Sequence, residues 1–230
     1  MKILLINPPH LSIGSRIPDE HLPRLGLLSI GGPLIDHGHQ GTLMDAEFGP
    51  MTLQNMVAQT KEYDEINGIA YLKNGIPTKT KPAPIIENID IYRVGWELMG
   101  SNNYTYWGKK KAVVVQFSRG CRHKCTYCGQ TIFWKKWRHR NPELFAREIT
   151  MLHKKYGIEV FNFADENPAT DKEAWKRFLI ALIVENITVI LVGSIRADNI
   201  VRDVDILHLY KKAGFERFLL GIEKVIFSSG

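Results

Sequence analysis

From residue 112 onward the chain alternates short β-branched runs with helical patterns, and this alternation constrains the fold more than any other feature. The predicted strands cover residues 112–117, 158–163, 187–192 and 217–221, and the predicted helices cover residues 142–156, 172–185 and 203–212. Strands that alternate with helices form parallel sheets of the α/β class. Four such units at a spacing of roughly 30 residues make half of a (β/α) barrel, whose complete form takes about 250 residues. The sequence therefore predicts a partial (β/α) barrel.

The first 65 residues predict a smaller α/β unit of the Rossmann type. Its predicted strands are residues 2–6 and 42–45, and its predicted helices are residues 22–36 and 52–61. Two strands are fewer than a complete doubly wound sheet carries. Next come a predicted hairpin around Asn74-Gly75 and a linker stiffened by prolines. We expect three parts: a truncated α/β unit at 1–65, a hairpin and linker at 66–108, and the partial barrel at 109–230.

Composition indicates a globular protein. The chain has 230 residues, 44% of them hydrophobic, which excludes a disordered or fibrous class. A net charge of +6 suits an anionic partner and equally a solvated surface, so charge alone assigns no partner. The apolar run at residues 2–6 is too short for a signal peptide, and Glu185-Asn186 divides the apolar stretch 178–195 into a helix and a strand. We expect a cytoplasmic protein without a membrane span.

The three cysteines of the chain form one loop directly after the first predicted barrel strand. Cys121, Cys125 and Cys128 have the spacing Cys-x3-Cys-x2-Cys, and this odd, clustered set excludes a disulfide framework. Three thiolates on a cubane iron–sulfur cluster leave one iron free to bind a substrate, and the basic residues of the loop suit an anionic cluster. The alternatives are a zinc site completed by His123 and ordinary buried thiols. Zinc sites favour a second ligand pair downstream, which this sequence lacks, so the loop favours an iron–sulfur cluster.

This motif, with Tyr127 before the last cysteine, resembles the signature of the radical S-adenosylmethionine (SAM) superfamily. The resemblance implies that Cys121, Cys125 and Cys128 hold a [4Fe-4S] cluster. It also implies that the open iron chelates the amino and carboxylate groups of SAM, which one electron cleaves to methionine and a 5′-deoxyadenosyl radical. Tyr127 would lie near the adenine.

Asp165 and Glu166 follow the second predicted strand, in the segment Ala164-Asp165-Glu166-Asn167-Pro168. Members of the superfamily often carry Gly-Gly-Glu-Pro here, a segment that binds the SAM amino group, so the resemblance implies that role for Glu166 and, less directly, for Asp165. Carboxylates at the carboxyl end of a barrel strand face the site, where an ammonium can pair with them. The alternative is an acidic cap and first turn for the next helix.

The ends of the third and fourth predicted strands supply further candidates. Ser194 and Arg196 follow the third strand, and the guanidinium of Arg196 suits the SAM carboxylate. A surface salt bridge between Arg196 and Asp198 is the alternative. Glu223 ends the fourth strand, either as a contact to the SAM ribose or amino acid or as a solvated strand end.

An aromatic and basic run at residues 133–140 follows the cysteine loop. Aromatic rings interleaved with cations suit stacking on nucleic-acid bases, or equally on a flat tetrapyrrole with carboxylate arms. The alternative is a surface segment whose two tryptophans pack inward. The run alone identifies no substrate.

The chain as a whole resembles, in pieces, the radical SAM branch that carries an N-terminal cobalamin-binding domain and includes oxidative cyclases of tetrapyrroles. The resemblance rests on residues 2–9, 25–28 with 36–39, 67–70, the cysteine loop with Phe133-Trp134, and 164–168. This sequence differs from the pattern of that branch in two ways. Cobalamin domains commonly carry Asp-x-His-x-x-Gly, but after Asp36 the histidine is out of register, which argues against cobalamin binding. The middle of that domain is missing near Glu65, and the later barrel strands are missing after Gly230.

The leading hypothesis is an anaerobic radical SAM enzyme, an oxidoreductase or methyltransferase that oxidises or methylates an unactivated carbon of a small molecule, with a tetrapyrrole as candidate. Its reductant would be a protein such as a flavodoxin or ferredoxin, and nucleic acid is not an expected partner. The alternatives are a radical SAM methylthiotransferase or methyltransferase, disfavoured by the lack of a second three-cysteine motif, and a non-catalytic iron–sulfur or zinc module. We expect this short chain to be a poor catalyst that associates through open sheet edges near Ala112 and Phe218.

Overall fold

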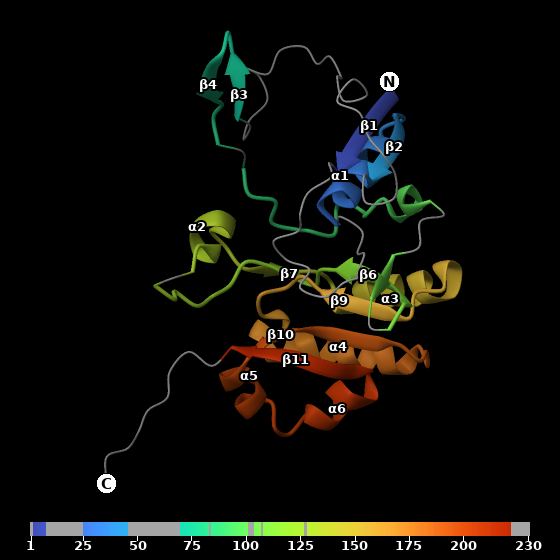
Figure 1. The fold of residues 1–230 in the computed structure, drawn as a ribbon. Coiled ribbons are helices and arrows are strands. Elements are labelled where there is room, and N and C mark those ends of the chain that lie inside the picture. The colour runs from blue at the N-terminus through green and yellow to red at the C-terminus, as the bar shows by residue number, and fades with distance from the viewer. Residues whose placement is uncertain are drawn as a thin grey trace.

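The computed structural model describes residues 2–7, 25–45, 70–82, 84–100, 104–106, 108–126 and 128–221. Its main body is a five-stranded sheet in the order β11-β10-β9-β6-β5 (Figure 1). The strands are β5 (Thr105–Tyr106), β6 (Lys110–Val115), β9 (Val160–Phe163), β10 (Ile190–Arg196) and β11 (Phe215–Gly221). Strands β6, β9, β10 and β11 are parallel neighbours in chain order, and β5 is antiparallel to β6. This arrangement confirms the α/β class and the partial (β/α) barrel.

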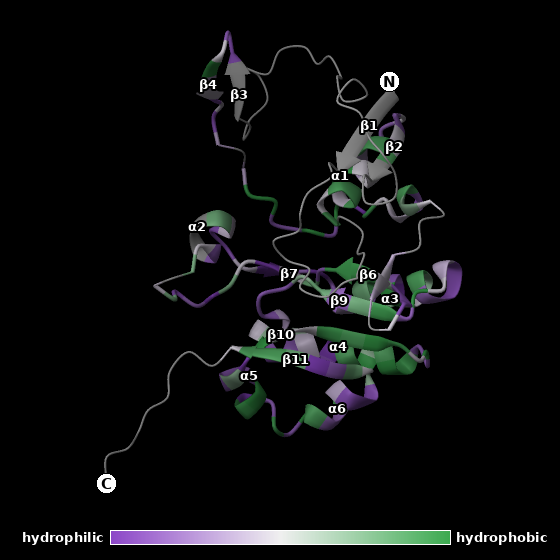
Figure 2. Ribbon diagram, in the orientation of Figure 1, coloured by the Kyte–Doolittle hydropathy of each residue, from purple (hydrophilic) through white to green (hydrophobic). Residues whose placement is uncertain are grey.

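Helices cover one face of the sheet. They are α3 (Pro142–Tyr156), α4 (Lys172–Val184), α5 (Ala197–Arg202) and α6 (Leu207–Lys212). Phe145 and Phe178 are fully buried between these helices and the sheet, where both rings meet Phe163. Figure 2 shows the apolar residues concentrated on β6, β9 and α4. The opposite face carries a much smaller apolar cluster of Ala112, Val160 and Val192, as expected for the concave side of a half barrel.

Two helices begin after a residue whose side chain caps the first turn. Helix α3 begins at Pro142, and the side chain of Asn141 accepts a hydrogen bond from the backbone N–H of Leu144 at 2.9 Å. Helix α4 begins after Asp171, whose carboxylate accepts from the N–H of Ala174 at 3.0 Å. The prediction for α3 is confirmed at both ends, and the prediction for α4 ends one residue late.

Several other predicted elements of the barrel differ from the structure at their ends. Strand β9 begins at Val160 instead of residue 158, and β11 begins at Phe215 instead of residue 217. The third strand begins at Ile190 instead of residue 187, because pairing with β9 starts at Ile190 opposite Val160. The strand continues to Arg196. Ser194 and Arg196, which were predicted to follow the strand, therefore lie within it. The predicted helix 203–212 is also wrong in extent, since a turn at residues 203–206 separates α5 from α6. The first barrel strand runs from Lys110 to Val115, so it begins and ends two residues earlier than predicted.

The N-terminal unit contains β1 (Lys2–Asn7), α1 (Leu25–Asp36) and β2 (Gln40–Asp45), with β1 and β2 parallel. The predicted helix 52–61 lies outside the described residues. The predicted hairpin is confirmed as β3 (Ala70–Lys73) and β4 (Ile76–Lys79). Its turn places Asn74 and Gly75 at φ values of 52° and 82°, as a two-residue hairpin turn of type I′ requires.

The segment before the barrel joins α1 to the main body. The N–H of Gly95 donates to the carbonyl of Leu28 in α1 at 2.7 Å, and the 3-10 helix η4 (Trp96–Met99) buries Trp96 in the main core. Nearer the barrel, Arg140 forms ion pairs with Asp90 and Glu148 at 2.8 and 2.9 Å. These contacts hold the segment against α3. The division into three parts stays a prediction.

The edge of the sheet at β6 is partly covered. Strand β5 pairs with Lys110 and Lys111, and the N–H of Ala112 donates to the carbonyl of Tyr104 at 2.9 Å. Ala112 is fully buried. The expected open edge at Ala112 is therefore wrong, because residues that precede the barrel supply the missing partner.

None of the helices in the described part of the chain is long and apolar enough to cross a membrane.

Candidate functional site

The cysteine loop leaves the sheet at the carboxyl end of β6, after the two-residue strand β7 (Ser118–Arg119). Cys121, Cys125 and Cys128 are half-buried free thiols. The N–H of Cys128 donates to the carbonyl of Cys125 at 3.1 Å, so the second half of the loop forms a tight turn. Gly120 has a φ of 90° and lies against the carbonyl of Lys136, where a side chain would not fit. The local backbone thus sets the direction in which the loop leaves the sheet.

The charges around the thiols come from β10 as well as from the loop. A terminal nitrogen of Arg196 lies 3.8 Å from the sulfur of Cys125. Burial raises the pKa of the Cys121 thiol, and the positive charge of Arg196 opposes that rise. Negative charge on Cys125 or Cys128 raises the pKa of the Cys121 thiol further.

The donor chemistry of the loop fits an iron–sulfur cluster, because thiolates are the ligands of such clusters. In the described ranges, no three His, Cys, Asp or Glu side chains meet closely enough to hold a metal ion. The fit therefore rests on the residue types, their spacing and the adjacent guanidinium of Arg196.

Asp165 lies after β9 and is only 4% exposed. Its carboxylate accepts hydrogen bonds from the N–H of Phe117 at 2.9 Å and from the N–H and hydroxyl of Ser118, both at 2.5 Å. Burial raises the pKa of Asp165 to about 7, against the opposing effect of these hydrogen bonds. The carboxylate thus faces the start of the cysteine loop. A contact between Asp165 and SAM stays a prediction.

Glu166 is exposed and faces a pocket beside the cysteine loop, with a volume of about 650 Å³. The pocket is lined by Gln116, Ser118, Gly120, Cys128, Gly129, Gln130, Phe133, Trp134, Ala164 and Glu166. Gln130 donates from Nε2 to the carboxylate of Glu166 at 2.6 Å. Sequence reasoning missed Gln130 and Gln116. The signal available for Gln116 was a polar residue near the end of an apolar strand, but the predicted strand 112–117 included it, whereas β6 ends at Val115.

Arg196 and Ser194 lie on the same side of β10, two residues apart. The guanidinium of Arg196 pairs with Asp198 at 2.8 Å while it also contacts Cys125, so the structure contains both the predicted salt bridge and a contact with the cysteine loop. Ser194 instead lines a separate hollow of the concave face with Asn162. The structure therefore brings Arg196, and not Ser194, to the cysteine loop. Tyr127 and Glu223 lie outside the described residues.

The aromatic and basic run does not form one continuous platform. Phe133, which is 75% exposed, and Trp134 belong to α2 (Gln130–Trp134), meet edge to face and line the pocket beside the cysteines. Trp137 stacks instead beneath Arg122, whose guanidinium carbon is 4.3 Å from the ring centre. Arg140 is held in the partly buried ion pairs with Asp90 and Glu148. Only the first two residues of the run reach the candidate site.

Residues 115–225 match the family model described as the radical SAM superfamily. The chain is 42% identical to the anaerobic magnesium-protoporphyrin IX monomethyl ester cyclase of Synechocystis, over 97% of the chain and 61% of the relative. It is 33% identical to the enzyme of the same name from Rubrivivax gelatinosus, over 69% of the chain and 29% of the relative. An uncharacterized methyltransferase of Pyrococcus horikoshii is 26% identical over 76% of the chain and 39% of the relative.

The chain is shorter than these relatives. It covers less than two thirds of the length of each. The alignment with the Synechocystis protein spans 304 residues, whereas the whole chain has 230, so at least 74 residues of that alignment face a gap in this chain.

Proposed function

Because residues 115–225 place this chain in the radical SAM superfamily, we propose that it holds a [4Fe-4S] cluster on Cys121, Cys125 and Cys128 and binds SAM in the adjoining pocket. One observation carries the proposal. Cys128 and Glu166, from two different parts of the chain, line the same pocket at the carboxyl ends of β6 and β9. Active sites of barrel folds lie at this end of the strands.

The side chains around the pocket suit the two charged groups of an amino acid. Glu166, held by Gln130, presents a carboxylate to an ammonium group. Arg196, in contact with Cys125, presents a guanidinium to a carboxylate beside the thiols. Asp198 competes for Arg196, so a bound carboxylate must share or replace that ion pair. Asp165 fixes the start of the loop, and Tyr127 is proposed to contact the adenine.

When bound, the cluster supplies the electron that cleaves SAM to methionine and a 5′-deoxyadenosyl radical. The chain's part is to hold the thiolates, orient SAM and exclude water. We propose oxidation of an unactivated carbon of a tetrapyrrole, because two of the relatives are named as magnesium-protoporphyrin IX monomethyl ester cyclases. The proposed reductant is a flavodoxin or ferredoxin.

Methylation of an unactivated carbon is the second candidate. The observation that favours it is the similarity to the Pyrococcus methyltransferase over 76% of this chain. Both candidates share the same first step, so they are separated by product analysis after SAM cleavage has been shown.

Metal content and magnetic resonance test the proposed cluster site. Anaerobic reconstitution with iron and sulfide should give about four of each per chain. The electron paramagnetic resonance spectrum of the reduced protein should then change when SAM is added. Glu166→Gln and Arg196→Gln should weaken that change, whereas Glu173→Gln, an exposed carboxylate of α4, should leave it intact.

The cysteine variants give the decisive control. Cys125→Ser should lose the cluster, and His123→Ala should keep it because the histidine is not a proposed ligand. One zinc per chain, lost in His123→Ala, would contradict the proposal, as would an unchanged spectrum at saturating SAM.

A further inference from the structure

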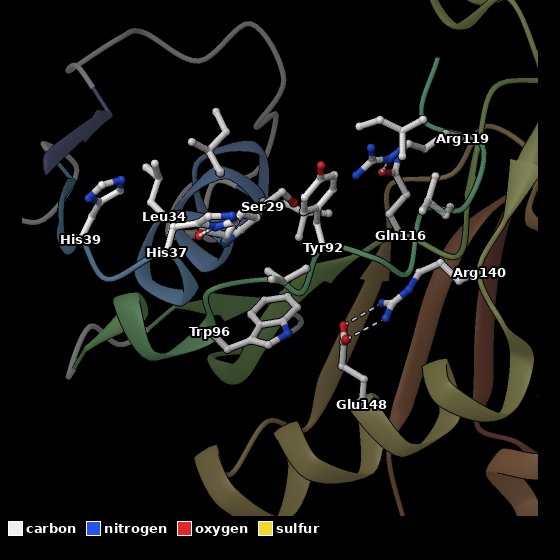
Figure 3. Close-up of a pocket in the computed structure, with 16 residues that line it drawn as sticks. Ser29, Leu34, His37, His39, Tyr92, Trp96, Gln116, Arg119, Arg140 and Glu148 are labelled. Atoms are coloured by element: carbon white, nitrogen blue, oxygen red, sulfur yellow. Dashed lines mark hydrogen bonds and ion pairs between the residues drawn. The ribbon is translucent and has the colours of Figure 1, made fainter. Parts of the chain in front are cut away.

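A second pocket lies between α1, the segment of residues 86–96 and the carboxyl end of β6 (Figure 3). Its volume is about 480 Å³, within the range of sites for small organic molecules. Ile30 and Leu34 of α1 and Tyr92 and Trp96 of the segment give it largely apolar walls. The pocket runs along the side of α1, whereas cofactors of doubly wound units bind beyond the carboxyl ends of the strands.

The wall next to β6 carries two arginines with different surroundings. Arg140 is bound by Glu148 through two hydrogen bonds of 2.9 Å, drawn as dashed lines in Figure 3. Arg119 is half-buried and donates from Nε to the side-chain oxygen of Gln116 at 3.2 Å. Within the described residues, Arg119 forms no ion pair with a carboxylate. A half-buried guanidinium without a paired anion is unfavourable, because burial removes water from the charge. An anionic group of a ligand would pair with Arg119 and offset this cost.

Trp96 belongs to the wall formed by the segment and is almost completely buried. Trp96 is only 4% exposed, and its indole Nε1 is buried without a hydrogen-bond acceptor among the described residues. Because this nitrogen is shielded from solvent, it does not open onto the pocket, and the charged donor that the pocket offers to an oxygen acceptor is the guanidinium of Arg119, inside largely apolar walls.

The wall that contains Arg119 also adjoins the pocket beside the cysteines. Gln116 lines both pockets. The guanidinium carbon of Arg119 lies 5.8 Å from the ring centre of Trp134, which belongs to the cysteine pocket. A ligand anchored on Arg119 would therefore end beside the proposed SAM site.

We infer that this pocket binds an apolar organic molecule that bears a carboxylate, with the carboxylate on Arg119 and the apolar body against α1 and Trp96. The apolar walls provide the affinity through buried area, and the charge-assisted hydrogen bonds to Arg119 provide the selectivity for an acid over a neutral molecule. This inference does not depend on the cluster, so the site can be tested on protein without iron.

The test uses two probes with the same hydrocarbon, 1-pyrenebutyrate and the neutral 1-pyrenebutanol, in equilibrium dialysis against the full chain. We expect the acid to bind at least about tenfold more tightly than the alcohol, as one charge-assisted pair predicts. Arg119→Gln should remove this preference and leave the binding of the alcohol unchanged. Arg122→Gln, which neutralises an exposed arginine of the same loop outside the pocket, should retain the preference.

The position of the site is tested by filling the pocket. Ile30 lines the pocket and is 53% exposed, so Ile30→Trp can place a large ring over it without disturbing the core. This variant should lose binding of both probes, whereas Val184→Trp, at a 77% exposed position of α4, should not. Equal affinity for acid and alcohol, an equal loss in Arg122→Gln, or full binding in Ile30→Trp would overturn the inference. Because no iron is present, each result is independent of the proposed cluster chemistry.

Discussion

At the scale of single residues, Asp165 controls the start of the cysteine loop. Its carboxylate accepts three hydrogen bonds from Phe117 and Ser118. Asp165→Ala would leave two buried N–H groups without acceptors, and we expect it to lower the free energy of unfolding by about 2 to 4 kcal/mol. Urea denaturation measures this loss, with Glu173→Ala on the exposed face of α4 as control. A change below about 0.5 kcal/mol, typical of surface substitutions, would contradict this role.

The raised pKa of Asp165 predicts that the stability of the fold depends on pH. Burial raises the pKa of Asp165 to about 7, whereas the pKa of an Asp in an unfolded chain is about 3.9. Between these values the unfolded chain has released this proton and the folded chain still holds it. The contribution of Asp165 to stability is therefore full below about pH 4, is lost as the pH rises to about 7 and is constant above.

Asp165→Asn provides the comparison for this pH dependence, because it cannot titrate. We expect the difference in unfolding free energy, wild type minus Asp165→Asn, to fall as the pH rises from about 4 to about 7. A difference that is constant or rises over this range would show that the carboxylate is ionised in the folded chain.

The sequence identified the residues of the site whose chemistry is distinctive. The spacing of Cys121, Cys125 and Cys128 predicted their loop, and the strand ends predicted that Glu166 and Arg196 lie near it. Two glutamines of the same pocket, at positions 116 and 130, were missed because an amide carries no charge and no spacing rule. The neighbours of Asp165 depend on which way the chain turns after β9, and no local pattern encodes that direction.

At the scale of elements, the contact between α1 and the segment before the barrel depends on two glycines. A Cβ atom on Gly32 would lie 2.4 Å from the carbonyl oxygen of Arg93, and one on Gly95 would lie 2.6 Å from the nitrogen of Gly32. The backbones therefore touch, and any side chain there must push α1 away.

Gly32→Ala should lower the free energy of unfolding by about 1 to 3 kcal/mol, as overpacking does. It should also weaken binding of 1-pyrenebutyrate, because α1 forms one wall of that pocket. Gly26→Ala on the same helix is the matched control, since its Cβ meets nothing within 4 Å and alanine favours helix. Thermal unfolding compares the two. Equal melting temperatures would contradict the close backbone contact.

The bounds of elements that begin or end at a cap or a turn residue were predicted well. The bounds of strands that are set by pairing with a neighbouring strand were not. Helix α3 follows the Asn141 cap and the glycine after Tyr156, and the β3–β4 hairpin follows Asn74-Gly75. By contrast, β10 begins where β9 begins, not where β-branched residues begin. The turn between α5 and α6 surrounds Asp203, which is fully buried and accepts hydrogen bonds from Arg202 and Tyr210. Such tertiary contacts are invisible in a linear pattern.

At the scale of the whole molecule, the half barrel leaves β11 at the end of the described sheet, paired on one side with β10. Leu219 and Leu220 of β11 are 74% and 45% exposed. An apolar edge strand promotes association, so we expect the apparent mass in light scattering to increase with protein concentration. Leu219→Lys should reduce this increase, and Val201→Lys, at a 76% exposed position of α5, should not. A monodisperse monomer at all concentrations would contradict the expectation.

The central claim is that three thiols and the adjoining pocket cleave SAM, and 5′-deoxyadenosine is its most direct readout. The anaerobically reconstituted chain, supplied with SAM and dithionite, should release 5′-deoxyadenosine as measured by chromatography and mass spectrometry. The product should be absent for Cys125→Ala and without reductant, while His123→Ala should retain it. Absence of 5′-deoxyadenosine from protein that carries about four iron and four sulfide per chain would contradict the claim.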